Sequence, residues 1–214
     1  MALKEENSNL EQQKQHLYNN WGKSRMITSD KVLKAFLAVP REFFVEPSYR
    51  DQSYSDHPLP IGCKQTISQP TTVMLMLQLL EVLPGKRVLE IGTGSGYNAA
   101  LLAELTCEVV TVERHLQLVK NAKDNLKQAG YEGIIVVNGD GKEGFSAQAP
   151  YDRIMVTAAA QKVPQQLKDQ LSVGGLLVAP IGLTYGCEML IVKKISYDNF
   201  LTSKHGLFSF VPLV

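Results

Sequence analysis

The stretch Arg87-Val88-Leu89-Glu90-Ile91-Gly92-Thr93-Gly94-Ser95-Gly96-Tyr97 decides the fold. Val88 to Ile91 is short and apolar, which is typical of a buried strand. The three glycines predict a tight turn, because a residue without a Cβ can take unusual backbone angles and come close to a ligand. Asn98 to Leu105 then predicts a helix. A strand, a glycine turn and a helix form the nucleotide-binding unit of doubly wound folds.

The spacing of the glycines indicates which ligand the turn would bind. A dinucleotide site expects G-x-G-x-x-G, whereas this chain has G-x-G-x-G with Glu90 at the end of the strand. A second acidic residue, Glu113, closes the apolar run Val109 to Val112, where a carboxylate can accept both hydroxyls of a ribose. A ligand with a ribose, a positive charge and no phosphate fits this acidic pair better than a dinucleotide. S-adenosylmethionine is such a ligand; the alternative is a glycine turn that binds nothing.

The composition is that of an ordinary globular protein. The chain has 214 residues, 44% of them apolar, and a formal net charge of +1, so we expect one domain and no electrostatic footprint for nucleic acid. The three cysteines and four histidines are scattered, which predicts free thiols in a reducing compartment and no metal site. Residues 1–20 are polar and unlike a signal peptide, and no run has transmembrane length. We therefore expect a cytoplasmic protein, with a monomer favoured.

The N-terminal part predicts helices and an irregular connection. Leu3, Leu10, Leu17 and Trp21 recur at roughly helical spacing, and a second helix is expected over Lys31 to Val39. Arg41 to Pro60 shows no clear period and should be an irregular surface segment over the core. Residues 1–60 would thus form a helical cap, and residues 61–214 the core of a single domain.

A polar loop, Gln65 to Ser68, precedes a predicted helix over Thr71 to Leu83 that opens at Pro70. Free backbone N–H groups at such a helix start favour an anion. Ser68 could instead be the helix cap.

After the glycine turn, strands and helices alternate, which predicts a mostly parallel sheet with helices on both faces. From Met189 onward, two strands joined by a polar turn predict an antiparallel edge. The expected strands are 109–113, 134–137, 153–156, 176–179, 189–195 and 207–213, and the expected helices are 116–129 and 163–171, with Gly174-Gly175 as a turn before the fourth strand.

In such sheets, ligands bind at the carboxyl ends of the strands. The glycine turn, Glu113 and Asp140-Gly141 all follow strands, so they should converge on one crevice. Asp140 or its neighbours could bind an adenine ring, or Asp140 could simply be a turn residue.

A set of short segments runs from about residue 30 to the end of the chain: Val39-Pro40-Arg41-Glu42 with Phe44-Val45, Leu59-Pro60-Ile61-Gly62, Gln65 to Pro70, Val88 to Tyr97, Val112-Glu113-Arg114, Gly139-Asp140-Gly141, Ala149-Pro150-Tyr151-Asp152, Val156 to Ala159 and Phe210-Val211-Pro212-Leu213. In these segments the chain resembles the protein-L-isoaspartate O-methyltransferase family. The glycine motif is shared by most S-adenosylmethionine enzymes of the Rossmann-like class I methyltransferase fold, whereas the Thr-Ile-Ser-Gln-Pro loop and the Val-Pro-Leu end are more particular to this family.

The resemblance implies methylation of the free α-carboxylate of L-isoaspartyl residues in damaged proteins, followed by closure to a succinimide and partial return to normal aspartate. S-adenosyl-L-methionine would be the cofactor and S-adenosyl-L-homocysteine the product. Ser68 would be the active-site residue, and Ser68, Pro70 and Val214 would contact an extended polypeptide substrate. The cofactor contacts would be Gln65, Thr66, Ile67, Ser68, Glu90, Gly92, Thr93, Gly94, Gly96, Glu113, Arg114, Asp140 and Gly141.

The expected reaction asks for no general base, because a carboxylate is already ionised at neutral pH. Ser68 should orient that carboxylate and not attack covalently, since no G-x-S-x-G surrounds it. Other class I methyltransferases, acting on small molecules or tRNA, and a non-catalytic S-adenosylmethionine-binding module remain the alternatives. The glycine spacing disfavours an NAD oxidoreductase.

Overall fold

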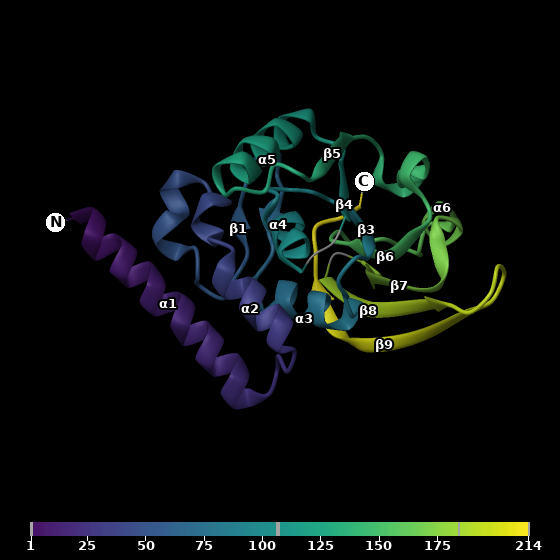
Figure 1. Cartoon of the computed structure of the whole chain (residues 1–214), viewed down its shortest axis with the longest axis horizontal. Coiled ribbons are helices and arrows are strands. Elements are labelled where there is room, and N and C mark those ends of the chain that lie inside the picture. The colour runs from purple at the N-terminus through teal and green to yellow at the C-terminus, as the bar shows by residue number, and fades with distance from the viewer. Residues whose placement is uncertain (1, 106–107, 184, 214) are drawn as a thin grey trace.

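The computed structural model describes residues 2–105, 108–183 and 185–213, which fold around a seven-stranded sheet of order β5-β4-β3-β6-β7-β8-β9 (Figure 1). The first five strands in this order are parallel, and β8 and β9 are antiparallel additions at one edge. The strands are β3 (Arg87–Ile91), β4 (Glu108–Glu113), β5 (Ile135–Asn138), β6 (Tyr151–Val156), β7 (Leu171–Ile181), β8 (Tyr185–Lys194) and β9 (Phe200–Ser209). The predicted doubly wound, mostly parallel sheet with an antiparallel C-terminal edge is confirmed.

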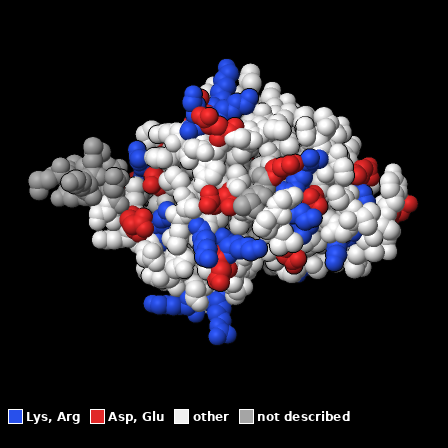
Figure 2. All heavy atoms as spheres, viewed as in Figure 1, with Lys and Arg blue, Asp and Glu red and all other residues white. Residues whose placement is uncertain are grey.

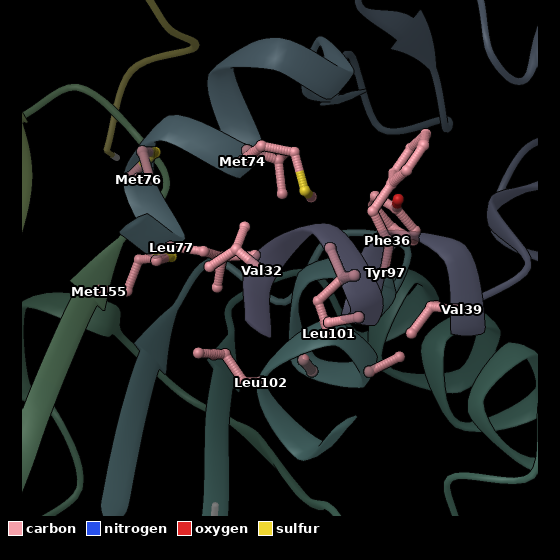
Figure 3. Packing of buried hydrophobic residues seen from close by; sticks show 14 of the residues in the cluster. Val32, Phe36, Val39, Met74, Met76, Leu77, Tyr97, Leu101, Leu102 and Met155 are labelled. Carbon is pink, nitrogen blue, oxygen red and sulfur yellow. The ribbon is translucent and has the colours of Figure 1, made fainter. Parts of the chain in front are cut away.

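Apolar side chains cover both faces of the parallel strands, which explains why the central strands are continuous apolar runs. On one face, α2 (Asp30–Ala38), α3 (Pro70–Leu80) and α4 (Tyr97–Glu104) pack together, with α5 (Leu116–Gln128) beside α4. Figure 3 shows Phe36 of α2, Met74 of α3 and Leu101 of α4 in this cluster. On the other face, the second cluster includes Leu167 of the short helix α6 (Gln165–Asp169).

The N-terminal helix α1 (Ala2–Ser24) lies along the outside of this helical layer (Figure 1). The predicted apolar stripe is confirmed for Leu10, Leu17 and Trp21, which are buried, whereas the side chain of Leu3 lies outside the described part of the structure. Trp21 packs edge-on against Phe36 with the ring centroids 4.6 Å apart, and its Nε1 donates to Thr71 Oγ1 at 2.8 Å. The helix is therefore anchored to both α2 and the beginning of α3.

The segment Arg41 to Pro60 differs from the sequence prediction. It contains two 3₁₀ helices, Arg41–Phe43 and Pro47–Gln52, and it buries Arg41, Phe44 and Tyr54 almost completely. The prediction of an irregular surface layer was wrong because the partners that bury these side chains come from distant parts of the chain.

Several boundaries also differ from the prediction, and three of them change how a strand begins, pairs or ends. Thr66–Ile67 is not loop but the short strand β2, which pairs with β1 (Leu59–Pro60). Gly174 and Gly175 lie within β7, where the pairing with β6 shifts register between Tyr151 and Arg153, so they do not form a separate turn before the strand. The last strand ends at Ser209, and the residues after it instead bridge to Ala159.

The face drawn in Figure 2 carries Lys and Arg interspersed with Asp and Glu, and neither sign predominates across it. Within the described residues, no helix is both long enough and apolar enough to span a bilayer, and no cluster of side chains could hold a metal ion.

Candidate functional site

The glycine turn lies at the point where the sheet changes direction. From β3 the chain moves to β4 and β5 on one side, and β6 lies on the other side of β3. A crevice opens at the carboxyl ends of the strands at such a switch point. Gly92 N donates to Val112 O of β4 at 2.9 Å, and Thr157 N donates to Ile91 O at 2.9 Å. The turn is thus fastened to both neighbouring strands.

Gly92 has to be a glycine for two reasons. Its φ is 95°, in the region that side chains disfavour. A Cβ there would also collide with Thr157 Oγ1, which donates to the carbonyls of Ile91 and Gly92 at 2.9 and 2.8 Å. Thr157 therefore holds the turn in its open conformation from the adjacent strand end.

A cavity lies over this turn and brings together many of the predicted site residues. It is bounded by the Gln65–Ser68 segment, the glycine turn and the ends of β4 and β6. Of the predicted residues, Gln65, Thr66, Ile67, Ser68, Gly92, Thr93, Gly94 and Glu113 line it.

Glu113 faces this cavity with its carboxylate already oriented. Its Oε2 accepts from Gly94 N at 3.0 Å, and its Oε1 accepts from His115 N at 2.9 Å. The residue is only 5% exposed. Each carboxylate oxygen can accept further hydrogen bonds, so Glu113 can receive a pair of vicinal hydroxyls while it orders the turn.

Glu90 lies beneath the turn, not in the cavity. It is completely buried, and its Oε2 accepts from Thr111 Oγ1 at 2.6 Å. The Thr111 hydroxyl is also 2.7 Å from that of Thr93 in the turn. Burial raises the pKa of Glu90 to about 8. The structure therefore places Glu90 under the turn, where it accepts from Thr111, whose hydroxyl contacts that of Thr93 in the turn.

A second, smaller cavity adjoins the first and shares Gln65 and Gly92 with it. Arg114 and Gly141 line this second cavity. Gly141 is buried, and a Cβ there would collide with Ile91. Asp140 lines neither cavity. It is exposed, and its Oδ1 accepts from Lys142 N at 2.9 Å, which agrees with the alternative that Asp140 is a turn residue.

Ser68 is half-buried between β2 and α3. The N-cap of α3 is Gln69, without a side-chain cap hydrogen bond, so the alternative that Ser68 caps the helix is wrong. The carbonyl of Ser68 accepts from Arg41 Nη2 at 2.8 Å, whereas its hydroxyl has no partner within the part of the chain that the structure describes. Ser68 can thus donate this hydroxyl to a ligand in the cavity that it lines.

Three other predicted residues do not line the cavity. Pro70 is the buried first residue of α3, and Gly96 caps α4, packed against Leu126 of α5. Val214 lies outside the described residues.

A groove opens from the cavity toward β9 and shares Ser68, Thr157 and Val211 with it. Apolar residues contribute much of its lining, among them Leu75, Leu207, Phe208 and Phe210. The groove is polar at the end near Ser68 and leads across the sheet edge, as an extended chain would require.

The sequence analysis missed several residues that line the cavity, namely Val73, Met76, Ser95, Tyr97, Asn98, Thr157, Ala158 and Val211. Thr157 and Ala158 could have been found, because they follow the strand on the other side of the switch point. Val211 follows no parallel strand end; its signal was the resemblance of the Val-Pro-Leu end to the family, and the bond from Ala159 N to its carbonyl, at 2.7 Å, places it.

Comparison with known proteins gives a consistent result over the whole chain. Residues 12–214 match the family model of protein-L-isoaspartate(D-aspartate) O-methyltransferase. The chain is 46% identical to the protein-L-isoaspartate O-methyltransferase of Staphylothermus marinus and 47% identical to that of Thermococcus sibiricus, in both cases over 97% of this chain and 96% of the relative.

Solved structures agree. A Plasmodium falciparum protein described as a protein-L-isoaspartate O-methyltransferase, in complex with S-adenosyl-L-homocysteine, superposes with a TM-score of 0.83 at 25% identity, covering 93% of this chain and 97% of that one. Another protein-L-isoaspartate O-methyltransferase structure also superposes with a TM-score of 0.83. Its sequence is 32% identical, and the match covers 93% of this chain and 65% of that one.

Proposed function

The chain belongs to the protein-L-isoaspartate(D-aspartate) O-methyltransferase family, and we propose that the cavity over its glycine turn is where the methyl donor meets the isoaspartyl carboxylate. The enzyme methylates the free α-carboxylate of L-isoaspartyl residues in damaged proteins, with S-adenosyl-L-methionine as cofactor. The small-molecule and tRNA alternatives are set aside, because similarity to this family extends over nearly the whole chain.

The residues present fit this cofactor. Gly92 and Gly94 line the cavity with backbone alone, and Glu113 faces the same space with lone pairs to spare. When bound, S-adenosylmethionine supplies a methyl group on a sulfonium; the carboxylate oxygen bonds to this methyl carbon as the carbon–sulfur bond breaks and its electron pair stays on sulfur. The protein has to hold the two reactants in line and keep water out.

We assign the ribose hydroxyls to Glu113, and the remainder of the cofactor to the glycine turn, the Gln65–Ser68 segment and the smaller cavity with Arg114 and Gly141. Ser68 then donates its hydroxyl to the acceptor carboxylate. Glu90 and Gly96 act by shaping the turn. Asp140 remains a candidate for the adenine, through its backbone neighbours or its own carboxylate, which can accept further hydrogen bonds besides that from Lys142 N.

The groove toward β9 is the proposed path of the polypeptide substrate. It begins at Ser68 and continues past Leu207 and Phe208, and its apolar lining suits side chains that flank the isoaspartyl residue. Pro70, at the first turn of α3, and Val214, which lies outside the described residues, are further proposed contacts of this substrate.

We also propose a cytoplasmic enzyme that works as a monomer without a nucleic-acid partner. The free thiols of Cys63 and Cys187 suit a reducing compartment. The net charge of +1 offers no basis for binding polyanions. Size-exclusion chromatography with light scattering checks the oligomeric state.

The observation that carries the proposed site is the meeting of Ser68, Gly92 and Glu113 in one cavity. The experiment is transfer of a tritiated methyl group to an isoaspartyl peptide and to its normal aspartyl twin. We expect label only on the isoaspartyl peptide; equal labelling of both, or of neither, contradicts the assignment. A non-catalytic module would bind the cofactor and label neither peptide.

A further inference from the structure

Arg41 is a buried cation that the reaction described above does not use. Its relative exposure is 0%, and it makes no ion pair with a carboxylate in the described residues. Burial lowers the pKa of Arg41 from its ordinary value. A charge removed from water without an opposite charge is unfavourable for folding, so stability alone is a poor reason for an arginine at this position.

The guanidinium joins three segments of the chain, two of which line the cavity. Its Nε donates to Ser53 O at 2.7 Å, and its Nη2 donates to Ser68 O at 2.8 Å. Its central carbon lies 4.8 Å from the centroid of the Tyr97 ring. Tyr97 directly follows the glycine turn as the first residue of α4, and it lines the same cavity as Ser68. One planar group therefore spans the segment that presents the proposed substrate contact and the end of the cofactor turn.

We propose that Arg41 is a positioning residue that sets the place of Ser68 relative to the glycine turn. The inference rests on the proposed role of Ser68. The fork of the guanidinium directs one donor to each of two carbonyls while its central carbon lies over the Tyr97 ring, and this combination fixes both distance and orientation. A lysine ammonium is a point charge without this fixed geometry, so it cannot replace the arginine at such a site.

The positioning role predicts a specific pattern in a double-mutant cycle. Arg41→Lys retains the charge but loses the fork, and an error of about 1 Å in position can reduce catalysis on the order of a hundredfold. We expect kcat/KM for an isoaspartyl peptide to fall roughly ten- to a hundredfold, mainly in kcat, with the affinity for S-adenosylhomocysteine little changed. In a Ser68→Ala background, Arg41→Lys should cause almost no further loss, because the hydroxyl that it places is gone.

Arg50→Lys is the matched control. Arg50 lies in the same segment, with its guanidinium carbon 5.9 Å from the Phe43 ring centroid, and it does not contact Ser68. We expect its kcat/KM to stay at the wild-type value. If Arg41→Lys does not fold, Arg41→Met serves instead, because an apolar residue of similar volume often replaces a buried charge without loss of stability.

The outcomes are distinguishable. Full activity of Arg41→Lys overturns the positioning role and leaves the proposed role of Ser68 intact. The same holds if the losses in kcat/KM from Arg41→Lys and Ser68→Ala multiply in the double variant, because the two residues would then act independently. A loss of cofactor affinity equal to the loss in kcat/KM also overturns the positioning role, since the effect would then lie in the turn. Full activity of Ser68→Ala overturns the proposed role of Ser68 itself, and the inference with it.

Discussion

Ser68 follows a short strand and precedes a helix, and neither element uses its hydroxyl. Its carbonyl is the group that the fold holds, through Arg41. The side chain is left facing a cavity with the glycine turn opposite, which is the arrangement that an orienting donor requires.

Ser68→Ala should remove one hydrogen bond to a charged group, worth about 1.5–3 kcal/mol. We expect kcat/KM for an isoaspartyl peptide to fall roughly ten- to a hundredfold, with cofactor affinity little changed. Steady-state kinetics with parallel calorimetry measure both quantities. A loss beyond about ten-thousandfold in a folded, cofactor-binding variant would point to a covalent role, because removal of a serine nucleophile costs on the order of a millionfold.

Glu113→Ala should weaken cofactor binding for two reasons. It removes a charged acceptor for the ribose, and it leaves Gly94 N and His115 N without their partner. A charge-assisted hydrogen bond of about 1.5–3 kcal/mol corresponds to roughly a ten- to hundredfold loss of affinity. Calorimetry with S-adenosylhomocysteine tests this, with the exposed Asp124→Ala on α5 as control. Unchanged binding would place the ribose elsewhere.

Glu90 predicts a pH dependence of stability. Its pKa is raised from 4.5 to about 8 by burial, so between these values the folded protein retains a proton that the unfolded chain has released. The unfolding free energy should therefore decrease as the pH rises through this range, and Glu90→Gln should abolish that part of the decrease. Urea unfolding at the two ends of the range measures it, and the exposed Glu132→Gln is the control. Identical pH profiles for wild type and Glu90→Gln would contradict the assignment.

Among the elements, the glycine turn depends most on its neighbours. Its glycines allow positive φ angles, but Thr157 at the end of β6 and Ile61 beside β1 decide how much space remains around it. A Cβ at Gly94 would lie 3.2 Å from Ile61 Cδ1, so the β1–β2 hairpin closes over the turn.

Gly92→Ala and Gly130→Ala form a matched pair. Both residues have positive φ, 95° and 85°, but only the Gly92 variant places its Cβ against Thr157, while Gly130 has open space. Each should lower stability by about 1–2 kcal/mol through backbone strain. Only Gly92→Ala should also impair cofactor binding. Calorimetry on the folded variants compares their cofactor affinities. Equal affinities would show that crowding at Thr157 does not affect cofactor binding.

At the scale of the whole molecule, the N-terminal helix is part of the same structural unit as the site. Trp21 is bonded to Thr71, and Thr71 N and Oγ1 donate to Asp56 at 3.0 and 2.7 Å. These contacts connect α1 to the start of α3, next to Ser68. The helical cap and α3 therefore share contacts at Thr71, which lines the substrate groove.

Trp21→Ala should lower the unfolding free energy by about 3–5 kcal/mol, the range for removing a buried aromatic side chain. Met26→Ala, in which a side chain that is 46% exposed is shortened, should have little effect. Urea unfolding followed by circular dichroism compares them. Equal midpoints for the two variants would mean that α1 does not stabilise the core.

The sequence by itself determined the features that depend on neighbouring residues. The glycine turn after β3, the alternation of strands and helices, and the place of Glu113 at the end of β4 all follow from backbone sterics and apolar periodicity, which act over a few residues. Even the convergence of the glycine turn and Glu113 follows, because parallel strands end at the same edge of the sheet.

Only the tertiary structure decided which polar groups are buried and what they contact. Arg41 is buried because Ser53, Ser68 and Tyr97, up to 56 residues away along the chain, surround it (97 − 41 = 56). Glu90 is held under the turn by the hydroxyl of Thr111 in the adjacent strand, which donates to its carboxylate, and Val211 reaches the cavity because Ala159 N donates to its carbonyl. Such contacts depend on packing between distant segments, and local sequence does not encode them.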